Sequence, residues 1–192
     1  MRKIMAMVTV VALLGGVSAC SDDKNSADKK EPATYSLAPR AVRDFETPLP
    51  EKPVKLGEIL YSVIAIRTGI VAVVGSHADW LPKGQYVRLR IAVTNEGRDM
   101  HNFTPLKQLL VANDGKTYKV SFDAMQIDRQ PNGVLTVARE ERREFDLWFD
   151  IPKTAKPQAL RVVGDPSSTE LGDQLKGTPS PGTKTTVDIA VS

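Results

Sequence analysis

Hydrophobic and polar residues alternate with a period of two over much of residues 54–192. In the segment QYVRLRIAVTN, Val87, Leu89 and Ile91 fall on one face. The residues between them, Arg88 and Arg90, fall on the other face. This alternation is typical of a β-strand with one buried face and does not fit the 3.6-residue period of a helix. The segments EFDLWFDI and TTVDIAV repeat the pattern, so strands are predicted there as well.

Turn-forming residues separate these predicted strands. The triplet Asn113, Asp114 and Gly115 lies between two short hydrophobic runs, which is a strong signal for a β-hairpin. Further strands are predicted at residues 58–66, 69–74 and 158–163, and one short helix at residues 167–176, where Ser167 can cap and Glu170 follows three residues later. Seven or eight short strands without a sustained helix predict an antiparallel β-sandwich.

The N-terminus has the pattern of a bacterial lipoprotein signal. Arg2 and Lys3 precede an eleven-residue apolar run, residues 4–14, which is too short to span a bilayer core that needs about 20 residues. The segment GGVSAC then places small residues before the only cysteine of the chain, as in a lipobox. We therefore expect residues 1–19 to be removed and Cys20 to carry acyl chains that hold the protein on the membrane.

The composition changes between Cys20 and residue 54. Residues 20–53 contain five prolines, thirteen charged residues and only ten hydrophobic ones. Such a segment buries too little apolar surface to order itself, so a flexible tether is predicted, followed by a folded domain at residues 54–192. The alternative is that residues 35–45 dock on the domain or bind a partner, in which case Phe45 and Leu49 would carry the contact.

The order of four segments, VKLGEILYSVIAI, PKGQYVRLRIAVTNEG, LLVANDGKTY and REFDLWFDIP, resembles the immunoglobulin-like domain of the mycobacterial secreted immunoprotective antigens and their associated uncharacterised lipoproteins. The most specific matches are Gly84 before a long strand that ends at Asn95, and the late aromatic-Asp-Ile-Pro of residues 149–152. The resemblance implies an immunoglobulin-like sandwich behind a lipobox and a tail, with no established catalytic residues. The charged run AREERRE, residues 138–144, replaces the glycine-containing turn that is common in this family.

One polar strand face contains the most unusual surface pattern. Glu144, Asp146, Trp148 and Asp150 share this face. A tryptophan among carboxylates predicts either a stacking platform for a sugar or a cation, or a ring packed beneath a long loop such as residues 164–182. Trp80, in a predicted end loop, is a second candidate for aromatic recognition.

The carboxylates of this face allow two interpretations. Glu144 and Asp146 lie two residues apart, roughly 7 Å between their Cα atoms, a spacing that paired catalytic carboxylates could use. The interpretation we favour is ion pairing with Arg88 and Arg90 on a neighbouring strand. We therefore expect a non-enzymatic protein without a cofactor.

A copper site is the alternative function. His77 and His101 lie on opposite sides of a long strand and cannot share an ion. Antiparallel connections could instead bring Met100, His101 and Met125 to one pole, and thioether and imidazole ligands suit Cu(I). The competing interpretation is a solvated histidine with methionines that fill the core.

The charge balance excludes one class of partner. The 26 Lys and Arg against 23 Asp and Glu give a net charge of +3, and losing Arg2 and Lys3 with the leader leaves +1. Nucleic-acid binding has no electrostatic basis in such a chain. We expect a recognition module on the extracytoplasmic face of the cell membrane, with an envelope or extracellular protein or a glycan as its partner.

Overall fold

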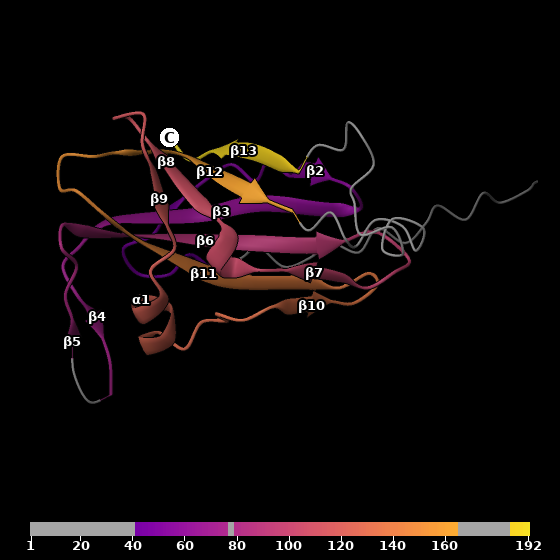
Figure 1. Ribbon diagram of the computed structural model, residues 1–192, viewed down its shortest axis with the longest axis horizontal. Helices are drawn as coiled ribbons and strands as arrows, with labels where there is room; N and C mark the ends of the chain where they lie inside the picture. Colours follow the sequence, from indigo (N-terminus) through magenta and orange to yellow (C-terminus); the bar gives the residue numbers. More distant parts are fainter. Residues whose placement is uncertain (1–40, 77–78, 165–184) are drawn as a thin grey trace, which may run out of the picture. The chain divides into compact units, whose positions relative to one another are not determined.

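The computed structural model describes residues 41–76, 79–164 and 185–192 (Figure 1). All of them belong to one compact unit, Arg40–Ser192. In chain order the elements are β1 (Thr47–Pro48), β2 (Val54–Leu56), β3 (Ile59–Ile70), β4 (Val73–Val74), β5 (Asp79–Trp80), β6 (Gln85–Asn95), β7 (His101–Phe103), a 3-10 turn (Pro105–Lys107), β8 (Leu109–Ala112), β9 (Thr117–Lys119), α1 (Phe122–Ile127), β10 (Leu135–Val137), β11 (Arg142–Ile151), β12 (Pro157–Val163) and β13 (Thr186–Ala190).

Two antiparallel sheets form the body of this unit. The first has the order β1-β3-β6-β11, with β2 also paired to β3, and the second has the order β13-β12-β8-β9. Two small pairs, β7 with β10 and β4 with β5, complete the described strands. The prediction of an antiparallel β-sandwich is confirmed. The predicted hairpin at residues 113–115 is also confirmed, because β8 pairs with β9 and Gly115 adopts a φ of +75° in the turn.

The pairing of β6 with β11 divides their side chains between two environments. Leu147 lies opposite Leu89, and both are fully buried in the core between the sheets. Asp146 lies opposite Arg90, and Trp148 follows on the same outer face. The predicted alternation along both strands is therefore confirmed, with the polar row on the side away from the core.

The folded unit begins earlier than predicted. Thr47 of β1 lies opposite Ile66 of β3, and the N–H group of Leu49 donates to the carbonyl of Ile64 at 2.8 Å. Residues 47–49 thus pair along the edge of β3, and the preceding residues reach over the outer face of the first sheet, where Arg43 bonds to Asp146 and Glu46 to Arg88. We call residues 41–53 the N-terminal strap. The prediction that the whole of residues 20–53 is a tether is wrong for this part, because backbone and ionic contacts compensate for its small hydrophobic content. Residues 20–40 lie outside the described residues.

The helix is found in an unexpected place. Helix α1 starts after Ser121, whose side chain accepts a hydrogen bond from the N–H group of Ala124, and Asp123 lies in its first turn. Both features favour a helix start. The helix predicted at residues 167–176 lies outside the described residues. Within the described ranges, no helix has the length and apolar character needed to cross a membrane.

Candidate functional site

The outer face of β6 and β11 is covered by the N-terminal strap rather than exposed. The carboxylate of Glu46 on the strap is 2% exposed and approaches three guanidinium groups. Its oxygens lie 2.9 Å from Arg88, 3.6 Å from Arg90 and 3.7 Å from Arg43. The side chains of Arg88 and Arg90 are only 13% and 12% exposed. This cluster holds the strap on the sheet through charges that water reaches poorly.

The two carboxylates of β11 join the same ionic cluster. Glu144 lies 3.3 Å from Arg90, and Asp146 lies 3.8 Å from Arg88. The predicted ion pairing of these residues across the two strands is therefore confirmed. Asp146 also accepts a hydrogen bond from Arg43 of the strap at 2.6 Å. The carboxylates are engaged in structural pairs, which leaves them poorly placed for contact with a ligand.

Asp146 is held in an unusual environment. Burial raises the pKa of this carboxyl above its ordinary value, while the nearby Arg43 and Arg88 oppose the shift. Its Oδ1 atom is buried and has no hydrogen-bond partner, and the Arg43 side chain is 44% exposed to water. The desolvation of the charged form therefore outweighs the attraction of the arginines.

Trp148 is buried, with 4% of its surface exposed. Its indole Nε1–H group donates to Asp128 at 2.8 Å, and its ring packs edge-on against Tyr86 at 5.8 Å. The guanidinium of Arg88 lies over the ring at 5.6 Å from the centroid. The prediction that Trp148 forms an exposed stacking platform is wrong. The ring packs beneath α1 and the turn after it. The loop that the sequence suggested as its cover, residues 164–182, lies outside the described residues from residue 165 onward.

The turn after α1 also protects the edge of β11. The side-chain oxygen of Gln130 accepts the backbone N–H of Asp146 at 2.9 Å, and its amide donates to Asp128 at 3.1 Å. Arg129, between them, has a φ of 55° and is exposed. Asp146 and Trp148 in the middle of the polar row of β11 are therefore enclosed by two segments, the N-terminal strap and the turn 128–130, whereas Glu144 at the start of the row stays exposed.

Asp150 and Gly84 form a structural pair. The carboxylate of Asp150 accepts the backbone N–H groups of Lys83 at 2.8 Å and Gly84 at 3.1 Å. A Cβ atom at Gly84 would collide with the backbone carbonyl of Ile151. Only glycine allows this close approach of the two strands. The two most specific pieces of the family resemblance thus contact each other, and Asp150 acts as a turn cap rather than a ligand contact.

Asn95 has a similar role at the other end of β6. Its side-chain amide is fully buried and donates to the carbonyls of Asp99 at 2.7 Å and Val137 at 3.1 Å, while its oxygen accepts the N–H of Gly97. In the charged run before β11, Glu140 adopts a φ of 57°, the conformation that a glycine would take more easily. These residues shape the loops at this end of the sandwich.

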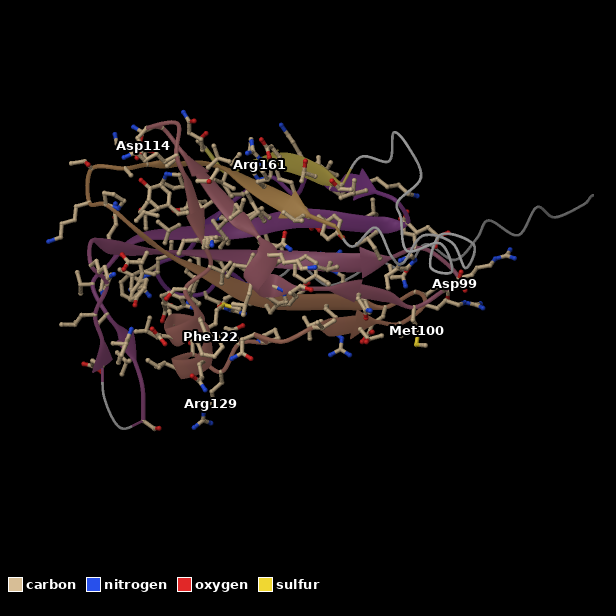
Figure 2. All side chains as sticks on the ribbon, in the orientation of Figure 1. Asp99, Met100, Asp114, Phe122, Arg129 and Arg161 are labelled. Carbon is tan, nitrogen blue, oxygen red and sulfur yellow. The ribbon has the colours of Figure 1, made fainter. Side chains whose placement is uncertain are left out.

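The three residues of the predicted copper site do not converge. Met125 lies in α1 and is completely buried in the core, whereas Met100 is 70% exposed. Phe122, which lies in α1 with Met125, marks the position of this helix in Figure 2, and Met100 lies at the opposite end of the sandwich. His101 is 2% exposed, and its Nε2 lies 2.9 Å from the Glu58 carboxylate. The alternative prediction of a copper site is therefore wrong. Along the described parts of the chain, no group of three or more His, Cys, Asp or Glu side chains could hold a metal ion.

Exposed apolar side chains gather around the hairpin formed by β4 and β5. Nine large hydrophobic residues are exposed among the described ones, and five of them lie on this hairpin, beside it or on the adjacent α1. These five define what we call the hairpin surface: Val71 (78% exposed), Val74 (77%), Trp80 (46%), Leu81 (70%) and Phe122 (50%). The hairpin extends away from the two sheets beside α1 (Figure 1). Of the two tryptophans predicted as recognition residues, Trp80 is the one that the structure leaves accessible.

Sequence reasoning missed two parts of this surface. Helix α1, which carries Phe122, was not predicted, although Ser121 followed by Asp123 is a recognisable helix start. The β4–β5 hairpin was predicted only as one strand and a polar loop. The sequence signal for this hairpin is a four-residue turn, residues 75–78, which contains a glycine and follows a short apolar run.

These observations define a small antiparallel β-sandwich in which the middle of the charged face is covered and five of the nine exposed large hydrophobic residues form the hairpin surface. The chain belongs to the family described as Domain of unknown function (DUF4352), which matches residues 50–189. The sequence has no match among curated proteins.

Solved structures agree with this fold. The yjhA protein from Bacillus subtilis has a TM-score of 0.51 at 14% identity, and the match covers 72% of this chain and 94% of that one. A presumed lipoprotein from the same organism, ycdA, gives 0.48 at 16% identity over 75% of this chain, which spans about two fifths (39%) of that protein. The secreted protein MPT63 from Mycobacterium tuberculosis gives 0.38 at 16% identity over 60% of this chain and 89% of that one. The resemblance drawn from the sequence is thus confirmed.

Proposed function

We propose that this protein is a non-catalytic recognition module, anchored by acyl chains on Cys20 to the extracytoplasmic face of the membrane, and that the hairpin surface contacts an envelope component. The observation that carries the proposal is the concentration of exposed apolar side chains on β4, β5 and α1. Contiguous exposed apolar groups on a folded domain are typical of interaction sites. The candidate partner classes are an envelope or extracellular protein, a glycan and the membrane itself.

The location is supported by the N-terminal sequence. A cationic start, a short apolar run and small residues before Cys20 together form a signal that lipoprotein-processing enzymes act on. One acyl chain holds a protein only weakly, whereas two or three make the attachment stable. The structural neighbours named above include a protein described as a lipoprotein and one described as secreted, and both descriptions agree with a location outside the cytoplasm.

The absence of a catalytic role is supported by what the charged groups already do. Glu46, Asp146 and Glu144 are paired with arginines on the covered face of the sheet. Asp150 caps a turn, and His101 contacts Glu58. A general acid or base needs to reach a substrate, and these groups are committed to structural contacts.

The role of the hairpin surface is tested by photo-crosslinking in native envelopes. A benzophenone amino acid replaces Trp80 in one variant and Met100 in a matched control, because Met100 is also exposed and apolar but lies away from α1. We expect a defined adduct from position 80 and none from position 100. Equal labelling from both positions, or none from position 80, contradicts the proposed contact surface.

The anchoring is tested separately by cell fractionation. Cys20→Ala removes the sulfur that would receive the lipid. We expect the wild-type protein in the membrane fraction after high-salt washing and no acylated, processed form of the variant. An identical mobility and fractionation of the two proteins contradicts lipid anchoring through Cys20.

A further inference from the structure

Apolar side chains occupy both faces of the β4–β5 hairpin. Val73 lies opposite Trp80 and Val74 lies opposite Asp79. Opposite residues of an antiparallel pair share one face, and neighbours along a strand point to different faces. Trp80 therefore shares the face of Val73, which is 3% exposed, while Val74, 77% exposed, points from the other face. Val73 belongs to the core, so its face packs against the domain near Val73 and is open near Trp80, which is 46% exposed. A flat partner placed on this face would leave Val74 uncovered.

A lipid interface fits this distribution better than a flat protein surface. An interface into which a hairpin dips surrounds it and covers apolar side chains on both faces. Tryptophan is enriched at membrane interfaces because its large ring is apolar and its N–H group is polar. Leu81 follows Trp80 directly and is 70% exposed, and Phe122 of α1 is 50% exposed beside the hairpin. Together they form an apolar group of the kind that partitions into the acyl boundary.

The chain itself keeps the hairpin close to a bilayer. The 21 residues from Cys20 to Arg40 separate the proposed anchor from the folded unit. Even fully extended they span only about 70 Å, so an anchored domain is always near the membrane that holds it. A weak contact is then sufficient, because the tethered surface has a high effective concentration at the bilayer.

The charges around the hairpin surface limit how deeply it can enter. Two exposed cations flank this surface: Lys83 follows the hairpin and Arg129 follows α1. Two exposed carboxylates lie on the same elements, Asp79 on β5 and Asp123 on α1. Arg129 points away from the sheets beyond α1 (Figure 2). Cations are attracted to an anionic headgroup layer and carboxylates are repelled. The balance allows contact at headgroup depth, and Asp79 opposes it.

We propose that the hairpin surface docks on the lipid bilayer that carries the Cys20 anchor, with Trp80 at the boundary between headgroups and acyl chains. The inference rests on the proposed anchoring and names the partner of the same surface. The domain then lies against the membrane instead of extending from it. The opposite end of the sandwich, with Met100, faces away from the lipid.

The experiment uses the mature acylated protein, purified from its membrane and reconstituted in vesicles of phosphatidylcholine and phosphatidylglycerol. Bromine atoms on the upper acyl chain quench nearby tryptophans. The protein has two tryptophans, and Trp148 is 4% exposed, so quenching reports on Trp80. We expect the loss of most of the Trp80 emission and a blue shift of the remainder in unbrominated vesicles. Trp80→Ala, which keeps Trp148, should show no quenching.

A matched variant and a strengthening variant complete the test. Trp80→Ala combined with Met100→Trp keeps two tryptophans and moves the probe to the other end, where we expect no quenching. Asp79→Asn removes the carboxylate that opposes docking, and we expect about fivefold stronger partition of the hairpin into anionic vesicles. Because this variant gains contact, its result does not depend on damage to the fold.

The outcomes separate this inference from the proposed function. If the mass shows that the protein is acylated and Trp80 is still not quenched, the bilayer contact is overturned. This holds whatever crosslinking from position 80 then captures: a protein, a glycan or a second copy of the chain. Equal quenching at positions 80 and 100 also overturns it, because the contact would be non-specific. Protein without acyl chains on Cys20 instead contradicts the anchoring on which the proposed function depends.

Discussion

Glu46→Gln is the sharpest perturbation of the ionic cluster beneath the N-terminal strap. The change keeps the side-chain volume but removes a charge that lies 2.9 Å from Arg88 and 3.6 Å from Arg90. The new amide group would also direct N–H donors towards guanidinium donors. Both arginines are nearly buried, so they would lose the partner that compensates for their desolvation.

The expected cost follows from the partners that remain. Breaking a buried ion pair costs about 3–5 kcal/mol when nothing replaces the lost partner. Here Arg90 keeps Glu144 at 3.3 Å and Arg88 keeps Asp146 at 3.8 Å. We therefore expect a loss of about 2–3 kcal/mol in the free energy of unfolding. For a folded unit of this size the Tm would fall by roughly 4–12 °C.

The assay is urea unfolding at neutral pH, followed by the fluorescence of the buried Trp148. Asp44→Asn is the matched control, because Asp44 lies two residues away on the same strap and is exposed. We expect the control to change the free energy of unfolding by less than about 0.5 kcal/mol. If Glu46→Gln unfolds at the same urea concentration as the control, the strap does not stabilise the domain.

Three further variants test other parts of the structure. Because burial raises the folded-state pKa of Asp146, its stabilising contribution is full below the ordinary value of 3.8 and is lost as the pH rises through the folded pKa; urea unfolding across this range should show wild type losing stability relative to Asp146→Asn, and a constant difference would refute the shift. Gly84→Ala should cost about 1–3 kcal/mol in thermal unfolding, because its Cβ meets the backbone of Ile151, while Gly133→Ala, with open space around its Cβ, should be nearly neutral; equal effects would contradict the close approach. Trp148→Phe should cost about 1–2 kcal/mol through the lost hydrogen bond to Asp128, with Trp80→Phe as the neutral control. Both variants are unfolded in urea and followed by circular dichroism, because Trp148→Phe removes the fluorescent probe; an unchanged midpoint for Trp148→Phe would show that the indole N–H contributes nothing.

The strands were predictable from sequence because their signal is local. Period-two alternation over β6 and β11 defined both faces, and the opposite charges on the outer face predicted that the carboxylates of β11 would pair with the arginines of β6. The turn at Gly115 was also predictable, since its conformation depends on a few adjacent residues. These features need no information from distant parts of the chain.

The cover of the outer face was not predictable in the same way. Glu46 belongs to a polar, proline-rich segment, and its burial depends on arginines 42 and 44 positions later in the sequence. For Trp148 the sequence allowed either an exposed platform or a ring packed beneath a loop, because its strand neighbours are carboxylates, whereas in the structure α1 and the turn at Asp128 cover it. Helix α1 has only six residues, too few for a helical period to emerge. Long-range contacts therefore decided which candidate residues were accessible.

The measurement that addresses the central claim most directly is the intact mass of the mature protein extracted from its native membranes. The account predicts a polypeptide that starts at Cys20 and carries a diacylglycerol thioether on that residue. A chain that retains Met1, or one that starts at residue 20 without acyl groups, would contradict the membrane-anchored recognition module.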